Sequence, residues 1–279
     1  MKYCVDFIKA NESILNEVDE INYTYDIKNI PQLERIIKDY NFKRINIILA
    51  VVDKEKINQS IETIRILKEK NNINNIYVQL FYFSEEIREE INKLKEYNIP
   101  FYFFSKVNDW ETFTGLINLG ISDIFISGDL GFSLPQVASR AHKNNIQIRA
   151  IPNYCNKIYK NTSALQTFFI RPEDIDVYES YIDILEFYGE AEKQKILYEI
   201  YKDEQWYGKL KEIILNFDND LDSRFIIPNF GEVRTKCERK CLKNEKCQIC
   251  QRIESLSKNL EKSKLMIKKD KKKESEDNG

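Results

Sequence analysis

The strongest constraint on the fold of this chain is a regular alternation between short apolar runs and longer stretches with helical spacing. The runs are rich in β-branched and aromatic residues, and between them apolar residues recur three or four positions apart, as at Ile57, Ile61 and Ile64. This alternation is typical of βα units arranged around a parallel sheet. We interpret eight runs as strands, at residues 21–26, 45–52, 76–83, 101–105, 123–127, 146–151, 167–170 and 181–187.

The number of these units indicates the fold class. Eight nearly continuous apolar strands predict an α/β protein with a (β/α)8 TIM-type barrel over residues 1–190. The alternative is an open doubly wound sheet, which would require fewer strands at the two ends. After the barrel we expect a helical extension over 191–230, a four-cysteine metal-binding segment with a helix over 231–262, and a disordered charged tail over 263–279.

Composition excludes several classes of function. The chain carries 43 basic and 45 acidic residues, so the whole molecule has no strong electrostatic attraction for nucleic acid, and any basic patch must be local. It has one histidine, His142, which argues against sites built from several histidines. No apolar run approaches the roughly 20 residues that span a bilayer, so we expect a cytoplasmic protein without a membrane partner. The sequence gives no indication of the oligomeric state.

Four of the six cysteines lie within fourteen residues near the C-terminus, at Cys237, Cys241, Cys247 and Cys250. In a reducing compartment such a cluster points to metal or redox chemistry rather than to disulfides. Four thiolates can hold an iron–sulfur cluster or a zinc ion, and the spacing leaves both open. Reduced thiols in a helical segment are the structural alternative. The interleaved Lys and Arg residues would offset the negative charge of a four-thiolate site.

Polar residues follow the predicted strands, at the end of a barrel where catalytic groups gather. We interpret a set of them as candidate catalytic or substrate-binding residues that share one opening: Asp53, Asp129, Asn153, Arg171 and Glu186. A buried carboxylate in such a set could have a shifted pKa suited to proton transfer. Taken singly, each has a structural alternative as a turn or helix-cap residue. Cys155 could add a fifth thiol ligand or a nucleophile, or could fill apolar space.

One segment carries a family resemblance. Residues 119–153, "LGISDIFISGDLGFSLPQVASRAHKNNIQIRAIPN", combine a strand, an acidic G-D-L-G turn, a helix with a Leu-Pro start and a strand ending in Pro-Asn. With "FFIRPEDI" at 168–175, this segment resembles the collagenase-like peptidase family, which includes iron–sulfur barrel proteins that assist oxygen-independent hydroxylation of ubiquinone precursors and RNA bases. The resemblance implies a barrel. Family members carry grouped cysteines in the catalytic half, whereas here the group follows the barrel.

These observations leave two hypotheses of function. In the first, the chain is an enzyme that resembles this family, holds iron–sulfur through its four cysteines, and acts on RNA or a small polar substrate. In the second, it is a non-enzymatic barrel with a zinc-clasped basic segment, which together with the run Lys268–Lys273 binds nucleic acid or a protein partner.

Overall fold

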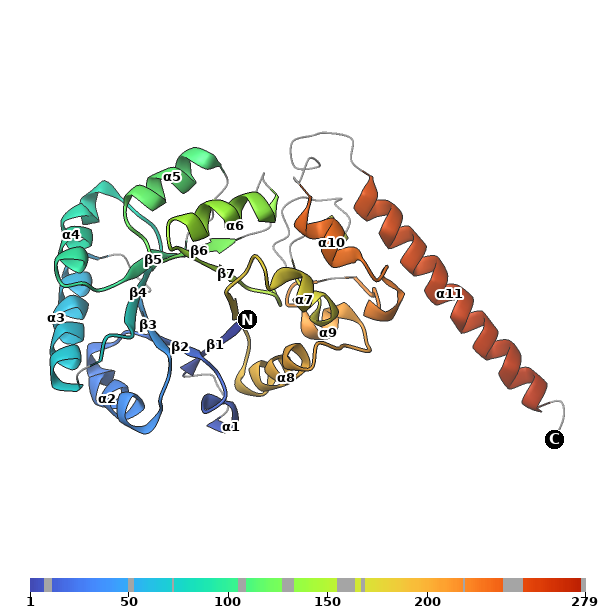
Figure 1. The fold of residues 1–279 in the computed structure, drawn as a ribbon. Coiled ribbons are helices and arrows are strands. Elements are labelled where there is room, and N and C mark those ends of the chain that lie inside the picture. The colour runs from blue at the N-terminus through green and yellow to red at the C-terminus, as the bar shows by residue number, and fades with distance from the viewer. Residues whose placement is uncertain are drawn as a thin grey trace.

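The fold is a closed barrel of eight parallel strands that pair in sequence order, with helices around it (Figure 1). The computed structural model describes residues 1–7, 12–49, 53–71, 73–104, 109–126, 133–154, 164–166, 169–217, 219–237 and 248–276. The strands are β1 Lys2–Asp6, β2 Glu20–Thr24, β3 Arg44–Leu49, β4 Ile76–Leu80, β5 Phe101–Phe103, β6 Asp123–Ile126, β7 Gln147–Ala150 and β8 Ile184–Glu186. The predicted (β/α)8 TIM-type barrel is therefore confirmed.

One observed strand was not predicted, and one predicted strand is not observed among the described residues. The barrel begins with β1, near the N-terminus. Its apolar run is short and has a charged residue at each end, so it does not stand out as a strand in the sequence. The predicted strand at 167–170 is wrong within its described part, because Phe169 and Ile170 lie outside any strand. Both side chains are nevertheless fully buried, and the Ile170 amide donates to the Pro152 carbonyl at 3.2 Å. This apolar run fills a second core instead of the sheet.

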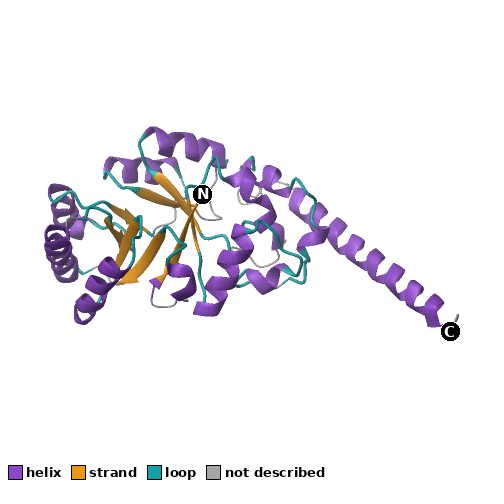
Figure 2. Ribbon diagram, turned by 60° about the horizontal axis from the view of Figure 1, so that its bottom comes forward, coloured by secondary structure: helices purple, strands orange, loops and turns teal. Residues whose placement is uncertain are grey.

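Helices cover the outside of the barrel (Figure 2). Each turns its apolar stripe inward, as α3 does with Ile57, Ile61, Ile64 and Leu67. The helices of the barrel are α1 Glu12–Leu15, α2 Ile30–Asp39, α3 Lys54–Asn71, α4 Arg88–Glu96, α5 Trp110–Asn118, α6 Leu134–Lys143, α7 Ile175–Tyr178 and α8 Ala191–Lys202, with 3-10 turns η2 Ile27–Asn29, η3 Glu85–Ile87, η4 Ala164–Gln166 and η5 Pro172–Asp174.

The register that closes the barrel brings polar residues to the same level inside it. Cys4 of β1 pairs with Glu20 of β2 on one side and with Glu186 of β8 on the other. Paired residues of neighbouring strands point to the same face, and all three of these side chains are fully buried. The barrel interior is therefore polar at the strands where the sheet closes.

The C-terminal part packs on the connection between β7 and β8. It contains α9 Leu210–Ile213, η6 Ser223–Phe225, α10 Phe230–Thr235 and α11 Ile249–Glu276. Its core includes Phe169, whose ring centroid lies 5.4 Å from that of Phe217 and 6.0 Å from that of Phe230. The helix α8, at the start of the predicted extension, is the eighth helix of the barrel itself.

The longest helix, α11, begins against the body and then projects away from it (Figures 1 and 2). Its early turns contact η4 and η6. We expected disorder over 263–279, whereas α11 continues to Glu276. Lysine and glutamate are good helix formers, and they make up more than half of residues 263–276.

Candidate functional site at the carboxyl end of the barrel

The barrel interior holds a network of five fully or almost fully buried charged side chains. Arg44 of β3 donates two hydrogen bonds to Asp123 of β6, at 2.8 and 2.6 Å. Arg149 of β7 donates to Glu20 Oε2 at 2.8 Å and to Glu186 Oε2 at 3.3 Å. Arg44 Nε also lies 3.6 Å from Glu20 Oε2, so each guanidinium faces carboxylates of more than one strand, and the network links strands that are distant in the sequence.

The charges of this network do not balance when every group is ionised, because two guanidiniums face three carboxylates. Burial favours the neutral form of Asp123, but Arg44 and Arg149 outweigh it and lower the pKa of that carboxyl. Burial dominates at Glu186 and raises its pKa in spite of Arg149. Oε1 of Glu20 and Oε1 of Glu186 have no hydrogen-bond partner within the described chain. A proton on Glu186 would therefore balance the network.

Two asparagines and a thiol complete the polar interior beside Glu20. Asn46 Nδ2 donates to Asn22 Oδ1 at 3.1 Å, and the Cys4 thiol donates to the same oxygen at 3.3 Å. Burial raises the pKa of Cys4 well above its usual value, so this thiol is neutral.

Aromatic rings separate this network from the carboxyl end of the barrel. Phe104, which follows β5, lies 4.8 Å from Phe125 and 6.5 Å from Tyr188, measured between ring centroids. Tyr188 follows β8 and also meets Tyr154, which follows β7, at 6.5 Å. Burial, and then the nearby Glu186 carboxylate, raises the pKa of Tyr188. Glu186 therefore lies beneath aromatic side chains, and Phe104, Tyr154 and Tyr188 are themselves half-buried.

Asn153, which we interpreted as a site residue, joins the ends of two strands. Its Nδ2 donates to the Tyr188 carbonyl at 2.7 Å, and its Oδ1 accepts from the Tyr188 amide at 3.1 Å. The side chain is fully buried. Asn153 therefore fixes the position of Tyr188 at the carboxyl end of β8.

Arg171 and Asp53 make contacts within the connections that follow β7 and β3. The buried Arg171 guanidinium makes two 2.7 Å hydrogen bonds with Asp174 and also reaches the carbonyls of Ser223 and Ile227 at 3.4 Å. It thereby anchors the C-terminal part to the β7–α7 connection. Asp53 is exposed, and its Oδ1 accepts from the Glu55 amide at 2.8 Å at the start of α3.

Of the five predicted residues, Glu186 and Asn153 thus both lie near the carboxyl end of β8, whereas the contacts of Arg171 are with Asp174 and the C-terminal part and that of Asp53 is at the start of α3. Asp129 lies outside the described residues. Sequence reasoning missed Glu20, Arg44, Asp123 and Arg149 because these residues stand within or at the start of apolar strands, where a charge resembles a strand boundary.

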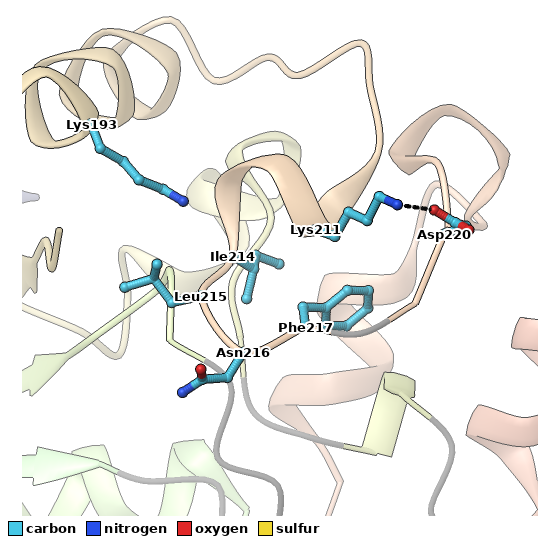
Figure 3. Close-up of a pocket in the computed structure, with 7 residues that line it drawn as sticks. All are labelled: Lys193, Lys211, Ile214, Leu215, Asn216, Phe217 and Asp220. Carbon is cyan, nitrogen blue, oxygen red and sulfur yellow. Dashed lines mark ion pairs between the residues drawn. The ribbon is translucent and has the colours of Figure 1, made fainter. Parts of the chain in front are cut away.

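A pocket of about 490 Å³ lies beside the carboxyl ends of β7 and β8 (Figure 3). The Leu215 amide donates to the Asn153 carbonyl at 2.7 Å, and Tyr154 and Leu215 form a parallel bridge, which places one wall against the end of β7. The first turn of α8, directly after β8, contributes Lys193. The lining residues are Lys193, Lys211, Ile214, Leu215, Asn216, Phe217 and Asp220. None of these residues is among the site residues that the sequence predicts.

The described cysteines of the predicted metal site lie at the two ends of the segment that carries it. Cys237 comes just after α10, and Cys250 is buried in the first turn of α11. Cys241, Cys247 and Cys155 lie outside the described residues. The residues that the structure describes contain no group of three or more potential metal ligands. The chemistry of the full donor set, four thiols on one short segment, fits zinc or an iron–sulfur cluster.

Comparison with known proteins adds no family. No protein-family model matches the sequence, and no curated protein matches it. In the part of the chain that the structure describes, every helix is too short or too polar to cross a bilayer.

Proposed function

We propose that this chain is a barrel enzyme that acts on a small polar substrate or an RNA base at the carboxyl end of its barrel, with a four-cysteine metal centre beside that end. One observation carries the proposal: α11, which holds Cys250 in its first turn, packs against η4. The turn η4 belongs to the connection that leaves the carboxyl end of β7, and barrel enzymes bind their substrates at this end.

The proposed metal ligands are Cys237, Cys241, Cys247 and Cys250. A bound iron–sulfur cluster supplies one-electron chemistry, whereas zinc supplies a Lewis acid or a structural clasp. The resemblance to the collagenase-like peptidase family supports the first of these. The cytoplasm, where thiols stay reduced, is the compartment that suits either.

The barrel residues would bind and orient the substrate. The half-buried rings of Phe104, Tyr154 and Tyr188 offer apolar faces at the strand ends, on which a planar base or ring can stack. Asn153 holds Tyr188 in place through its backbone. Beneath these rings, Arg149, which also binds Glu20, keeps Glu186 in a fixed position, so Glu186 is a positioning residue under Tyr188 rather than a group that touches the substrate.

The test is metal and sulfide content, with an absorbance spectrum, on protein purified without oxygen. We expect iron and acid-labile sulfide in the native chain, loss of both in Cys247→Ser, and retention in Cys4→Ala, which removes only a thiol of the barrel interior. A native chain without bound metal under these conditions would contradict the proposal. Stoichiometric zinc would favour a structural clasp.

A second function is favoured by the projecting part of α11. The helix carries nine basic and five acidic residues, and most of the basic ones lie in its second half. If this helix binds nucleic acid, affinity should fall steeply as salt is raised, because counterions are released from the phosphates. Binding to a short RNA or DNA duplex, measured with the full chain and with a chain that ends at Ile267, tests this function. Equal binding by both chains would exclude it.

A further inference from the structure

The pocket beside β7 and β8 combines apolar walls with cationic groups. Ile214 and Phe217 are almost fully buried beneath it, and Lys193 and Lys211 reach it from two different elements (Figure 3). Its volume of about 490 Å³ is in the range of pockets that hold metabolites. A ligand that fits this lining has an apolar or planar part and an anionic group.

The two lysines are in different electrostatic states. Lys211 forms an ion pair with Asp220, which also pairs with Lys209 at 3.2 Å. The hydrogen bonds from Lys211 and then from Lys209 lower the pKa of Asp220, so the carboxylate stays ionised. The Lys193 ammonium, in contrast, has no ion pair or hydrogen bond with any described residue. An anion that enters the pocket would meet Lys193 unopposed and would compete with Asp220 for Lys211.

The backbone of the β8–α8 turn lets Lys193 occupy this place. Gly189 has a φ of +141°, and a Cβ on it would stand 3.3 Å from Cγ of Lys193. The absence of a side chain at Gly189 therefore leaves room for the Lys193 stem. In the same turn, the buried Gln194 donates to the Gly189 carbonyl at 2.8 Å and accepts from the Asp6 amide at 3.0 Å. The turn is thus held to the ends of both β8 and β1.

We propose that this pocket binds the phosphate group of a nucleotide-sized substrate, with Lys193 as its principal cationic ligand and Lys211 as a second one shared with Asp220. This inference rests on the proposed function in one respect: the ligand is a substrate only if the chain is the enzyme proposed above. The recognition itself depends only on the pocket, because a phosphate gains charge-assisted hydrogen bonds from ammonium groups in a partly enclosed space.

The experiment is isothermal titration of the full chain with a nucleoside monophosphate, with inorganic phosphate and with the uncharged nucleoside. We expect the monophosphate to bind, inorganic phosphate to compete with it, and the nucleoside to bind at least about tenfold more weakly, since a hydrogen bond to a charged group contributes roughly 1.5–3 kcal/mol. The proposal would be overturned if the nucleoside and the monophosphate bound equally well. It would also be overturned if none of the three ligands bound.

Variants assign the contact. Lys193→Met should weaken monophosphate binding at least about tenfold. Lys195→Met, which makes the same change two residues away on α8 and outside the pocket, should leave it unchanged. Asp220→Asn should tighten binding because it removes the competitor for Lys211, a result that a purely structural role of Asp220 would not produce. Unchanged binding by Lys193→Met, with unfolding temperature equal to that of the native chain, would refute the assignment.

The two proposals can fail separately. Binding is measured without turnover, so it does not require the metal centre. A chain that binds the monophosphate but contains no metal would contradict the metal proposal and support the pocket. A chain with an intact metal centre and no affinity for the monophosphate would support the metal proposal and contradict the pocket proposal.

Discussion

Arg149 shows how single residues hold this barrel together. TIM-type barrels usually fill their interior with layers of branched apolar side chains. Here a fully buried guanidinium instead contacts carboxylates from β2, β6 and β8. Burying charges costs several kcal/mol per ion, and this cost is offset only when each charge is well paired. Arg149 and Arg44 both have such pairing, whereas one oxygen each of Glu20 and Glu186 has none.

The raised pKa of Glu186 leads to a prediction about pH. A carboxyl whose pKa is higher in the folded state than its ordinary value of 4.5 destabilises the fold progressively as pH rises from that value through the folded-state pKa. Glu186→Gln removes this titration. We expect the variant to gain stability relative to the native chain as the pH rises from 5 to 8. Urea unfolding across this pH range measures it.

A matched control separates this effect from general changes in charge. Glu96→Gln makes the same substitution at an exposed position in the last turn of α4, and it should leave the pH dependence unchanged. The lowered pKa of Asp123 acts in the opposite sense and at lower pH, because its stabilisation is lost only as the pH falls below its ordinary value of 3.8. If the stabilities of Glu186→Gln and of the native chain changed in parallel from pH 5 to pH 8, the prediction that Glu186 loses its proton in this range would be wrong.

At the residue scale the sequence could indicate Glu186 but not its partners. Glu186 ends an apolar run, which is the pattern expected of a barrel site residue. Arg44 and Asp123 are 79 positions apart, and their pairing depends on the register of a closed sheet. That register depends on the closure of the whole barrel, so it cannot be predicted from a local sequence pattern. For the same reason Asn153 was correctly expected at a strand end, while its contact with Tyr188 could not be foreseen.

At the scale of elements, α10 packs closely on the start of α7. The Gly231 amide donates to Asp174 Oδ1 at 3.2 Å, while the same carboxylate accepts from Arg171. A Cβ added at Gly231 would stand 2.8 Å from the Asp174 Cβ, a distance that requires one helix to move. The short helix α10 is therefore fixed by an approach that glycine allows.

This approach predicts that Gly231→Ala lowers the free energy of unfolding by about 1–3 kcal/mol, as over-packing does elsewhere. Gly115→Ala is the control within the same chain. Gly115 lies in α5 with nothing within 4 Å of its added Cβ, so alanine should stabilise the protein by about 0.5–1 kcal/mol through its better helix propensity. Urea unfolding of both variants gives the two values. Effects of the same sign would contradict the proposed contact.

Elements of the barrel were easier to predict than those that follow it, and the reason is physical. A buried strand or an amphipathic helix leaves a local period in the sequence, and eight such units determine a closed sheet. Phe169 and Ile170 form a similar apolar run, but their partners are Phe217 and Phe230 in the C-terminal part. A short apolar run shows that a segment is buried; it does not show against what.

At the scale of the whole molecule, α11 divides into a docked part and a projecting part. Cys250, Ile253 and Ser257 are buried, and Asn219 donates to Glu254 at 2.9 Å. Further along α11, the Lys264 ammonium lies 4.9 Å from the centre of the Phe225 ring. The helix therefore joins the cysteine segment to the core of the C-terminal part before it leaves the molecule.

This division predicts different effects along one helix. Ile253→Ser should lower the free energy of unfolding by about 2–3 kcal/mol, because Ile253 is 6% exposed and loses its apolar contacts. Leu256 is 56% exposed, so Leu256→Ser should change the free energy of unfolding by less than about 0.5 kcal/mol. A chain that ends at Ile267 should unfold at the temperature of the full chain, since the later part of α11 projects away from the body (Figures 1 and 2). Thermal unfolding of the three proteins measures these effects, and a lower unfolding temperature for the shortened chain would mean that the projecting half packs on the body or on a second copy.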